Sequence, residues 1–267
     1  MSQPFIIDSH THIGLYGRLP CPEMSVPERL AMMDRLGIAL AIGSDQEALA
    51  EGGHAGLTLA RRAYEESRGR LLAQGIFDPR AANRCLGELN DALGWAGLRG
   101  LKIHPTMHAT PADAPSYAPA WHFAAAHDLP IMTHSWSASA HNPAQALSTP
   151  ERFEPFIKQF PGVRFVLGHA GGRGRGRAEA VRLARTYSNV YLDFAGDIFC
   201  HRLIENLVAG VTAKKILFGS DFPWLRPEAH LTRVLLAPLS TAEQADILRH
   251  NAARVYKIEE TPCSPST

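Results

Sequence analysis

The sequence predicts an α/β protein, a single-domain (β/α)8 barrel of the TIM type. Eight short apolar, β-branched segments occur along the chain, and each is followed by a stretch with helical periodicity. Near-continuous apolar strands are typical of parallel strands buried beneath helices. A length of 267 residues is what eight such units require. A doubly wound open sheet is the alternative, but the Gly-rich turn that usually follows its first strand is missing.

The order of strands and helices can be read along the chain. The strand-like segments are 5–12, 38–44, 71–78, 98–105, 130–136, 164–171, 190–196 and 215–223. Two capping boxes, Ser-Val-Pro-Glu at 25–28 and Ser-Thr-Ala-Glu at 240–243, predict helix starts. The second opens a final helix that we expect to run to about Val255. Thr149 before Pro150 predicts a capping hydroxyl and a further helix start.

Composition limits the class of protein and its partners. Residues 1–258 are expected to form one barrel domain and residues 259–267 a loose C-terminal tail. A hydrophobic content of 45% with 20% charged residues is typical of a globular protein with a sizeable core. A net charge of +1 gives no general attraction to nucleic acid or an anionic membrane. With no secretory signal or membrane-spanning segment in the sequence, we expect a cytoplasmic location.

Polar residues recur at the ends of the predicted strands. Asp8, His10 and His12 alternate along the first strand, so they are expected to share one face. In a barrel, the carboxyl ends of all strands surround one mouth, where active sites lie. The other polar residues at these strand ends are Lys102, His104, His134, His169 and Asp221. Barrel closure would bring the whole set together.

Each of these residues has a simpler interpretation when taken alone. A single buried histidine is more often a hydrogen-bonded core residue, and a strand-end aspartate often caps the next helix. Together they would bury several imidazoles and carboxylates in one place, at a cost of about 2–7 kcal/mol for each unpaired polar group. A divalent cation removes that cost by supplying positive charge to the lone pairs. Mixed His and Asp ligands favour Zn²⁺, with Mn²⁺, iron or cobalt as alternatives. Asp8, deeper in the barrel, is expected to support the site by holding the ring N–H of a ligand histidine.

Four motifs carry a resemblance to a known family. They are DSHTH at 8–12, THSW at 133–136, LGHAGG at 167–172 and FGSDFPW at 218–224. As an ordered set they resemble the amidohydrolase superfamily, and more narrowly its amidohydrolase-2 (amidohydrolase-related) branch of metal-dependent hydrolases. The resemblance extends from Ile6 to the HNAARVY segment at 250–256. The branch includes lactonases and non-oxidative decarboxylases.

The resemblance implies a set of site residues. In single-metal members the ligands correspond to His10, His12, His134 and Asp221, with His169 as a catalytic residue beside the metal. In two-metal members the strand-six histidine becomes a ligand and a carboxylated lysine on strand four bridges the ions.

Lys102 lies on strand four, so a second metal bridged by a carboxylated Lys102 stays open, although one metal is favoured. Two other classes also begin with H-x-H. TatD-type nucleases need a middle-strand glutamate that is missing here. Polymerase-and-histidinol-phosphatase enzymes lack a terminal FGSD strand.

The expected function is hydrolysis of a small lactone or cyclic amide or ester. A divalent cation lowers the pKa of bound water toward about 7, and Asp221 would act as general base. Non-oxidative decarboxylation of a small aromatic or unsaturated acid at the same site is the alternative. A third hypothesis is a degenerate barrel that keeps a structural metal and binds a partner. The complete set of polar residues argues against it, since structural sites need fewer groups.

Other residues are candidates for contact with a small, anionic substrate. They are Lys102, His104, Trp136 and Arg173, with Trp224 as a further apolar wall. The Gly-Arg segment 171–177 would either hold a carboxylate or phosphate or form a solvated surface loop, and both interpretations stay open. A homo-oligomer also stays open, with dimers the commonest closed assembly.

Overall fold

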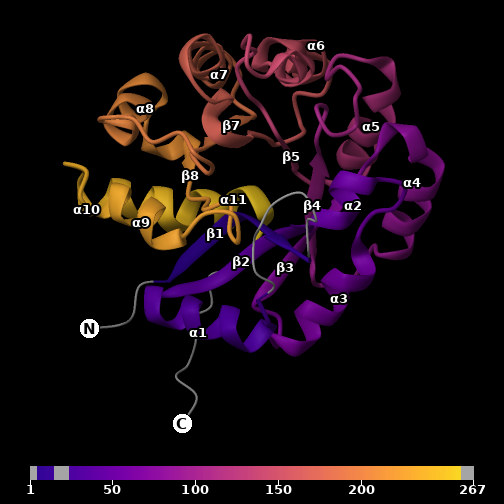
Figure 1. Cartoon of the computed structure of the whole chain (residues 1–267), viewed down its shortest axis with the longest axis horizontal. Helices are drawn as coiled ribbons and strands as arrows, with labels where there is room; N and C mark the ends of the chain where they lie inside the picture. Colours follow the sequence, from indigo (N-terminus) through magenta and orange to yellow (C-terminus); the bar gives the residue numbers. More distant parts are fainter. Residues whose placement is uncertain (1–4, 15–23, 260–267) are drawn as a thin grey trace.

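Parallel strands follow one another around a barrel in chain order, from β1 to β8 (Figure 1). The computed structural model describes residues 5–14 and 24–259 of the chain. The strands are β1 (Ile6–Ile13), β2 (Ile38–Asp45), β3 (Leu71–Ile76), β4 (Leu98–Ile103), β5 (Ile131–Thr133), β6 (Phe165–Leu167), β7 (Val190–Asp193) and β8 (Ile216–Leu217). Every neighbouring pair from β1 to β8 is parallel, which confirms the predicted fold class.

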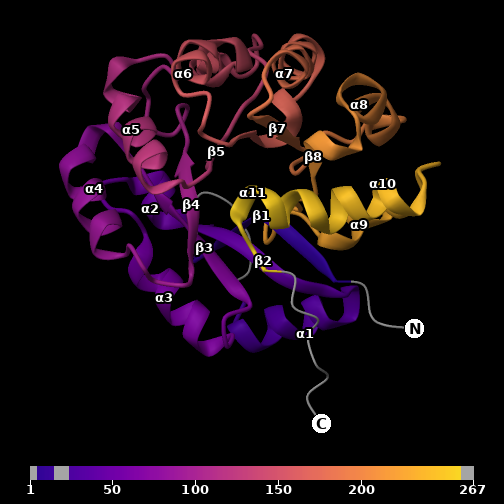
Figure 2. The same ribbon diagram turned by 180° about the vertical axis from the view of Figure 1, so that it is seen from behind.

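Helices surround the strands on the outside of the barrel (Figures 1 and 2). They are α1 (Val26–Leu36), α2 (Gln46–Glu51), α3 (Leu57–Glu66), α4 (Ala82–Asp91), α5 (Ala118–His127), α6 (Glu154–Gln159), α7 (Gly174–Thr186), α8 (Leu203–Val211), α9 (Pro227–Leu235), α10 (Thr241–Ala245) and α11 (Asn251–Tyr256). Both predicted capping boxes are present, at Ser25 before α1 and Ser240 before α10. A π-helical turn joins α10 to α11, so the predicted final helix extends to Tyr256.

The prediction for Thr149 is only half right. A 3₁₀ turn, Pro150–Phe153, does begin at the proline and continues into α6. The Thr149 side chain makes no capping hydrogen bond there.

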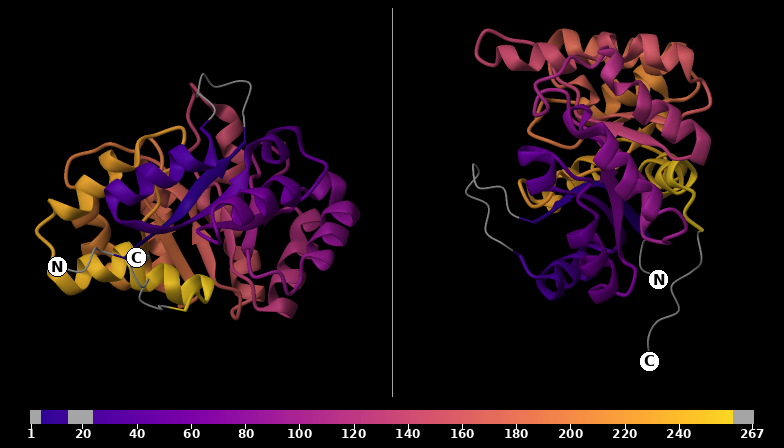
Figure 3. Two further views of the ribbon diagram at one scale, coloured as in Figure 1. Left: turned by 90° about the horizontal axis from the view of Figure 1, so that it is seen from below. Right: turned by 90° about the vertical axis from the view of Figure 1, so that its right-hand side faces the viewer.

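One end of the barrel is closed by α11, which lies across it in the rear view (Figure 2). Inward-facing apolar residues of six strands pack against this helix: Ile7, Ile42, Leu72, Met132, Val166 and Leu217 from the strands, with Ala252, Ala253, Val255 and Tyr256 from α11. Gln74 of β3 donates a hydrogen bond to the Tyr256 hydroxyl at 2.9 Å. The side views show the C-terminal helices beside the first strands (Figure 3). Because this end is filled, the opposite, carboxyl end of the strands is the open end of the described barrel.

The barrel is closed between its first and last strands by backbone hydrogen bonds. The Ser9 N–H donates to the Phe218 carbonyl at 2.9 Å, and the Asp221 N–H donates to the His10 carbonyl at 2.8 Å. These bonds continue past the end of β8, because β8 itself covers only Ile216–Leu217. The segment after β8 is therefore held against β1.

The later strands are shorter than the sequence predicts. The predicted segments 164–171 and 215–223 shrink to β6 and β8, because the backbone leaves the extended conformation at the polar residues that follow. His169, Ala170 and Asp221 have φ values of 59°, 46° and 65°. The left-handed region is unfavourable for residues with a Cβ atom and ends a strand. His169 and Asp221 therefore lie on sharp turns after β6 and β8, whereas His10, His12 and Lys102 lie within β1 and β4.

No helix among the described residues is long and apolar enough to cross a membrane. Cys85 and Cys200 are free thiols. The predicted tail at 259–267 lies outside the described residues except for Glu259, so the boundary at 258 stays a prediction.

Asn251 ties α11 to the start of β8. It is fully buried, and its side-chain nitrogen donates to the carbonyls of Ala213 and Ile216 at 2.7 and 2.6 Å. We expect Asn251→Ala to lower the free energy of unfolding by about 1–3 kcal/mol for each backbone carbonyl that loses its hydrogen bond. Urea unfolding measures this loss. Exposed Asn206 on α8 is the matched control, and an equal effect of Asn206→Ala would contradict the assignment.

His108, in the loop after β4, should make stability depend on pH. It is fully buried with Nδ1 2.8 Å from the Tyr117 hydroxyl, and burial lowers its pKa from 6.5 to about 4. Its neutral form is favoured in the folded chain, so its contribution is complete above pH 6.5 and is lost as pH falls toward 4. His108→Gln should flatten that part of a stability–pH curve, by about 1.4 kcal/mol per pH unit at most. His201→Gln, at an exposed position, should leave the slope unchanged.

Candidate metal centre and active site

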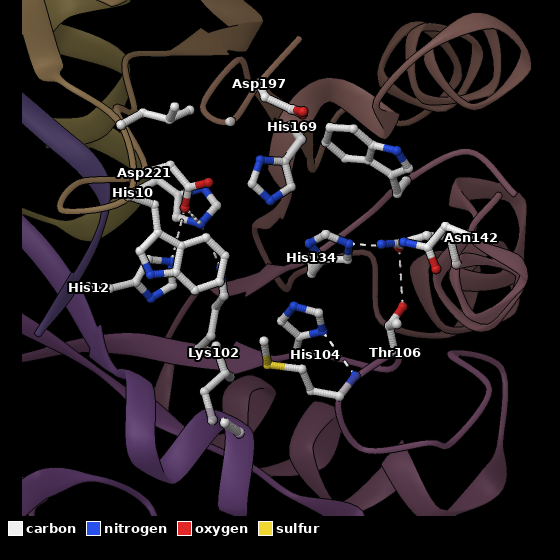
Figure 4. Close-up of a pocket in the computed structure, with 18 of the residues that line it drawn as sticks. His10, His12, Lys102, His104, Thr106, His134, Asn142, His169, Asp197 and Asp221 are labelled. Atoms are coloured by element: carbon white, nitrogen blue, oxygen red, sulfur yellow. Dashed lines mark hydrogen bonds and ion pairs between the residues drawn. The ribbon is translucent and has the colours of Figure 1, made fainter. Parts of the chain in front are cut away.

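A pocket of about 1110 Å³ opens at the carboxyl ends of the strands (Figure 4). It contains every residue predicted as a ligand, a catalytic group or a substrate contact. Those lining it are His10, His12, Lys102, His104, His134, Trp136, His169, Arg173, Asp221 and Trp224. Residues from five of the eight strand ends or the loops after them therefore meet in one place, as barrel closure requires.

Three of these residues offer ligand atoms that converge on one point. His12 Nε2 lies 3.0 Å and His10 Nε2 3.7 Å from Oδ1 of Asp221. One ligand atom from each lies within 4.8 Å of the others, and all three side chains are buried. Two imidazole nitrogens and a carboxylate oxygen are ligands that Zn²⁺ and Mn²⁺ accept. The residues thus fit a divalent cation.

The rings of His10 and His12 are each oriented by a hydrogen bond at Nδ1, the nitrogen that faces away from Asp221. His10 Nδ1 lies 3.0 Å from Oδ2 of Asp193, and His12 Nδ1 lies 3.1 Å from the Ser44 hydroxyl. Metal-binding histidines are usually held in this way through the nitrogen that faces away from the metal. Asp193 and Ser44 were not predicted. Asp193 ends β7 in the motif VYLDF, so its place at a strand end was the available signal.

Asp221 is ionised in this environment. Burial alone would raise the pKa of Asp221. The hydrogen bond from His12 and the nearby imidazoles of His169 and His10 outweigh this effect, so the pKa lies well below its usual value. Burial lowers the pKa of His10 to about 4 and also lowers that of His12. Neutral imidazoles beside an ionised carboxylate are the protonation states that a metal site needs.

His134 lies beside this group but is held differently. Its Nε2 is 2.8 Å from the side-chain oxygen of Gln145, and its ring stacks on His104 with centroids 4.1 Å apart (Figure 4). Among the described residues, the ligand atoms of His10, His12 and Asp221 form a group within 4.8 Å that does not include His134. Its role as a fourth ligand stays a prediction. Gln145, which orients the ring, lies in the 3₁₀ helix Pro143–Ser148 after β5, away from the strand ends that marked the other site residues in the sequence.

Lys102 is a buried amine on the pocket floor. It is 1% exposed, and its Nζ lies 2.8 Å from His10 Nε2. Burial lowers its pKa to about 8, although the carboxylates of Asp193 and Asp221 raise it. Much of the amine is therefore charged at neutral pH, close to the point where the three ligand atoms converge.

His169 lies on a left-handed turn after β6. Its Nδ1 is 2.9 Å from the Ala195 carbonyl, and its ring centroid lies 4.9 Å from that of His10. The Ser135 hydroxyl accepts from the Gly171 N–H at 3.2 Å and donates to the Gly168 carbonyl at 2.6 Å, which stabilises the turn. His169 is thus presented to the pocket by a tightly held loop.

Two indole rings and one ion pair complete the pocket. The ring of Trp224 stacks on that of His12 with centroids 5.3 Å apart, and the ring centroids of Trp136 and His169 lie 5.4 Å apart. Arg173 pairs with Asp197 at 3.3 Å, with both side chains exposed. Arg173 precedes α7, so the Gly-Arg segment forms the loop and first turn of that helix. A contact between the Gly-Arg segment 171–177 and a carboxylate or phosphate stays a prediction.

The predicted role of Asp8 is wrong. It was expected to hold the ring of a ligand histidine, but its carboxylate accepts from the Ser220 hydroxyl and N–H, at 2.6 and 3.0 Å. A register shift between Asp8 and Thr11 interrupts the alternation of β1, so Asp8 does not line the pocket. Burial raises its pKa to about 7.

The fold and the site together define a TIM barrel with a candidate metal centre at the carboxyl end of its strands. The family model described as amidohydrolase matches residues 7–258. The chain therefore belongs to the amidohydrolase-2 family, as the strand-end motifs predict. A comparison with curated proteins found no significant match.

Solved structures share the fold at low sequence identity. A 2,6-dihydroxybenzoate decarboxylase in complex with 2,6-dihydroxybenzoate has a TM-score of 0.73 at 18% identity, covering 96% of this chain and 100% of that one. A dihydroxybenzoic acid decarboxylase from Polaromonas sp. JS666, with bound manganese and 2-nitroresorcinol, scores 0.72 at 18% identity, with coverages of 97% and 98%. An uncharacterised TIM-barrel protein from Bordetella bronchiseptica scores 0.74 at 16% identity, with coverages of 96% and 99%. At these identities the likeness establishes the fold.

Removal of any one of the three converging side chains should weaken cation binding. We expect His10→Ala, His12→Ala and Asp221→Ala each to lower the affinity for Mn²⁺ or Zn²⁺ by at least about 10–100-fold, the range found even for residues that only support ligands. Metal content after dialysis and competition with a chelator measure the effect. His201→Ala is the control, since His201 is exposed and does not line the pocket. Retention of a full equivalent by all three variants would exclude this site.

Proposed function

We propose that this protein is a metal-dependent, non-oxidative decarboxylase of a small aromatic acid. The observation that carries the proposal is the convergence of His10, His12 and Asp221 beside the buried amine of Lys102, in a pocket walled by indole rings. Similar solved structures include decarboxylases of dihydroxybenzoates, which are planar anionic acids. The pocket offers positive charge and flat apolar surface, which suit a planar anionic acid.

His10, His12 and Asp221 would hold one divalent cation, with His134 as a fourth ligand after rotation away from Gln145. When bound, a divalent cation supplies a Lewis acid that binds the substrate carboxylate and an adjacent oxygen. Manganese bound in a similar decarboxylase supports Mn²⁺ beside the Zn²⁺ favoured by the ligand types.

Lys102 would act as a charged amine and not as a bridging carbamate. Its Nζ donates to His10 Nε2 in the structure, and an ammonium group at this depth can bind the substrate carboxylate. A carboxylated Lys102 would instead add a negative charge next to Asp193 and Asp221 and require a second cation. A metal-to-protein ratio of one supports the ammonium form, and a ratio of two contradicts it.

Asp221 would supply the proton that replaces the carboxylate. As CO₂ leaves, the carbon–carbon bond breaks and its electron pair stays on the ring carbon, which takes a proton from the Asp221 carboxyl. The pKa of Asp221 is well below its usual value in the structure, so the group must gain this proton in the complex. A substrate carboxylate placed beside it favours that gain, because two neighbouring carboxylates raise the proton affinity of one of them.

The remaining residues would bind and orient the ring. Trp136 and Trp224 form flat walls at the pocket, and His104 stacks on His134 near its floor. His169 would hydrogen-bond through Nε2 to a ring substituent or the departing carboxylate, because its Nδ1 is already hydrogen-bonded to the Ala195 carbonyl. Arg173 at the rim would contact a second polar substituent when released from Asp197.

Hydrolysis of a small lactone or cyclic amide or ester is the second candidate, on one specific observation. The low pKa of Asp221 makes it a proton acceptor at neutral pH, as a general base for water attack requires. The two reactions use the same residues and differ in the direction in which Asp221 moves a proton.

A substrate panel distinguishes the two candidates. We expect the Mn²⁺- or Zn²⁺-loaded protein to release CO₂ from hydroxybenzoates and related acids. Asp221→Asn should lose about 10²–10⁴-fold in kcat, as expected for removal of an acid–base group. CO₂ release by a coupled assay and incorporation of deuterium into the ring from D₂O, followed by NMR, measure the reaction.

His201→Ala is again the activity control. Ring opening of lactones without CO₂ release from any acid would move the assignment to hydrolase. Unchanged turnover in Asp221→Asn would contradict both mechanisms.

A further inference from the structure

Asp193 lies beneath the pocket and has both carboxylate oxygens occupied. It is fully buried at the end of β7 and does not line the pocket. Its Oδ2 lies 3.0 Å from His10 Nδ1. Its Oδ1 accepts from the backbone N–H groups of His169 and Ala195, at 3.1 and 2.8 Å. One side chain therefore contacts a candidate metal ligand and the backbone of a candidate catalytic histidine.

The chemistry of these contacts determines the tautomer of His10. An ionised carboxylate only accepts hydrogen bonds, so the proton must lie on His10 Nδ1 and the lone pair on Nε2. Lys102 independently agrees, because an ammonium group only donates and its Nζ lies 2.8 Å from Nε2. Ser44 behind His12 differs, since a hydroxyl can donate or accept and so serves either tautomer.

The second oxygen acts on a strained turn. His169 and Ala170 both adopt left-handed conformations, with φ/ψ of 59°/18° and 46°/38°. Two consecutive residues with side chains rarely do so without support from their surroundings. The hydrogen bond from the His169 N–H to Asp193 provides such support at the first of them.

We propose that Asp193 is the positioning residue of this site. One oxygen fixes His10 in the form that presents Nε2 to a cation, and the other holds the His169 turn beside it. The proposal rests on the metal centre of the proposed function but not on the reaction catalysed there. Asp193, His10 and His169 also offer ligand atoms within 4.8 Å of one another, so direct ligation of a second cation by Asp193 is the competing explanation.

Asp193→Asn tests the proposal because the amide can fit in only one orientation. Its oxygen must face the two backbone N–H groups, which leaves its NH₂ facing His10 Nδ1. The proton of His10 then moves to Nε2, and the lone pair is lost from the position that faces the cation. We expect affinity for Mn²⁺ and Zn²⁺ to fall about 10–100-fold, with Tm nearly unchanged.

Ser44→Ala is the matched control, and we expect a smaller loss of affinity than in Asp193→Asn. Chelator competition on the full-length protein measures both variants. Equal affinity in Asp193→Asn and the unaltered protein would overturn the proposal. Two cations in the unaltered protein and one in Asp193→Asn would also overturn it, because Asp193 would then be a ligand.

A second readout needs no metal, and its result on the unaltered protein tests the proposal without a variant of Asp193. Long-range ¹⁵N–¹H NMR of the histidine-labelled, metal-free protein reports which ring nitrogen carries the proton, with His10 assigned by comparison with His10→Gln. We expect His10 protonated at Nδ1 in the unaltered protein and at Nε2 in Asp193→Asn. An Nε2-protonated His10 in the unaltered protein would overturn the proposal, even if Asp193→Asn fails to fold. Absence of any cation binding would instead contradict the proposed function. The NMR measurement of the His10 tautomer would then still test whether Asp193 positions His10.

Discussion

The contact between the first strand and the segment after the last one is the constraint on which this site depends. The Asp221 N–H donates to the His10 carbonyl, and the Asp8 carboxylate binds both the N–H and the hydroxyl of Ser220. Residues more than two hundred positions apart are thereby fixed side by side. The Asp221 carboxylate can lie within 3.0 Å of His12 only because the backbone of this segment is held first.

This closure explains why costly groups collect at one end of the barrel. At the opposite end, α11 packs against apolar residues from six strands, so the fold is stabilised there by ordinary burial. At the carboxyl end the chain instead leaves the extended conformation at His169 and Asp221. Strain of this kind persists where surrounding hydrogen bonds outweigh it, and Asp193 and Ser135 supply them here. Stability and the candidate site are thus separated along the barrel axis.

The strand periodicity and the polar residues at the strand ends were sufficient to predict the barrel and to bring His10, His12, His104, His134, His169 and Asp221 to one pocket. His10, His134 and Asp221 each follow an apolar run, and parallel strands bring such positions to one edge. The supporting groups could not be predicted in the same way. Ser44 and Gln145 are common polar residues whose partners are set by ring orientation, which no sequence spacing records. The predicted role of Asp8 is wrong for a related reason. A single register shift in β1 reverses the direction of a side chain, and the sequence does not reveal that shift.

The charges beneath the pocket connect the site to the kind of substrate that it accepts. Asp193 and Asp221 are buried carboxylates with pKa values below the usual range, and both interact electrostatically with the amine of Lys102. Without a cation, the floor of the pocket carries one negative charge in excess. A divalent cation held by His10, His12 and Asp221 would reverse the sign and leave one positive charge in excess. A monoanionic acid would then neutralise the site, whereas a neutral lactone would do so only beside a hydroxide formed from bound water. The balance of charge therefore requires one anion in the pocket, which is the substrate itself in a decarboxylase and hydroxide in a hydrolase.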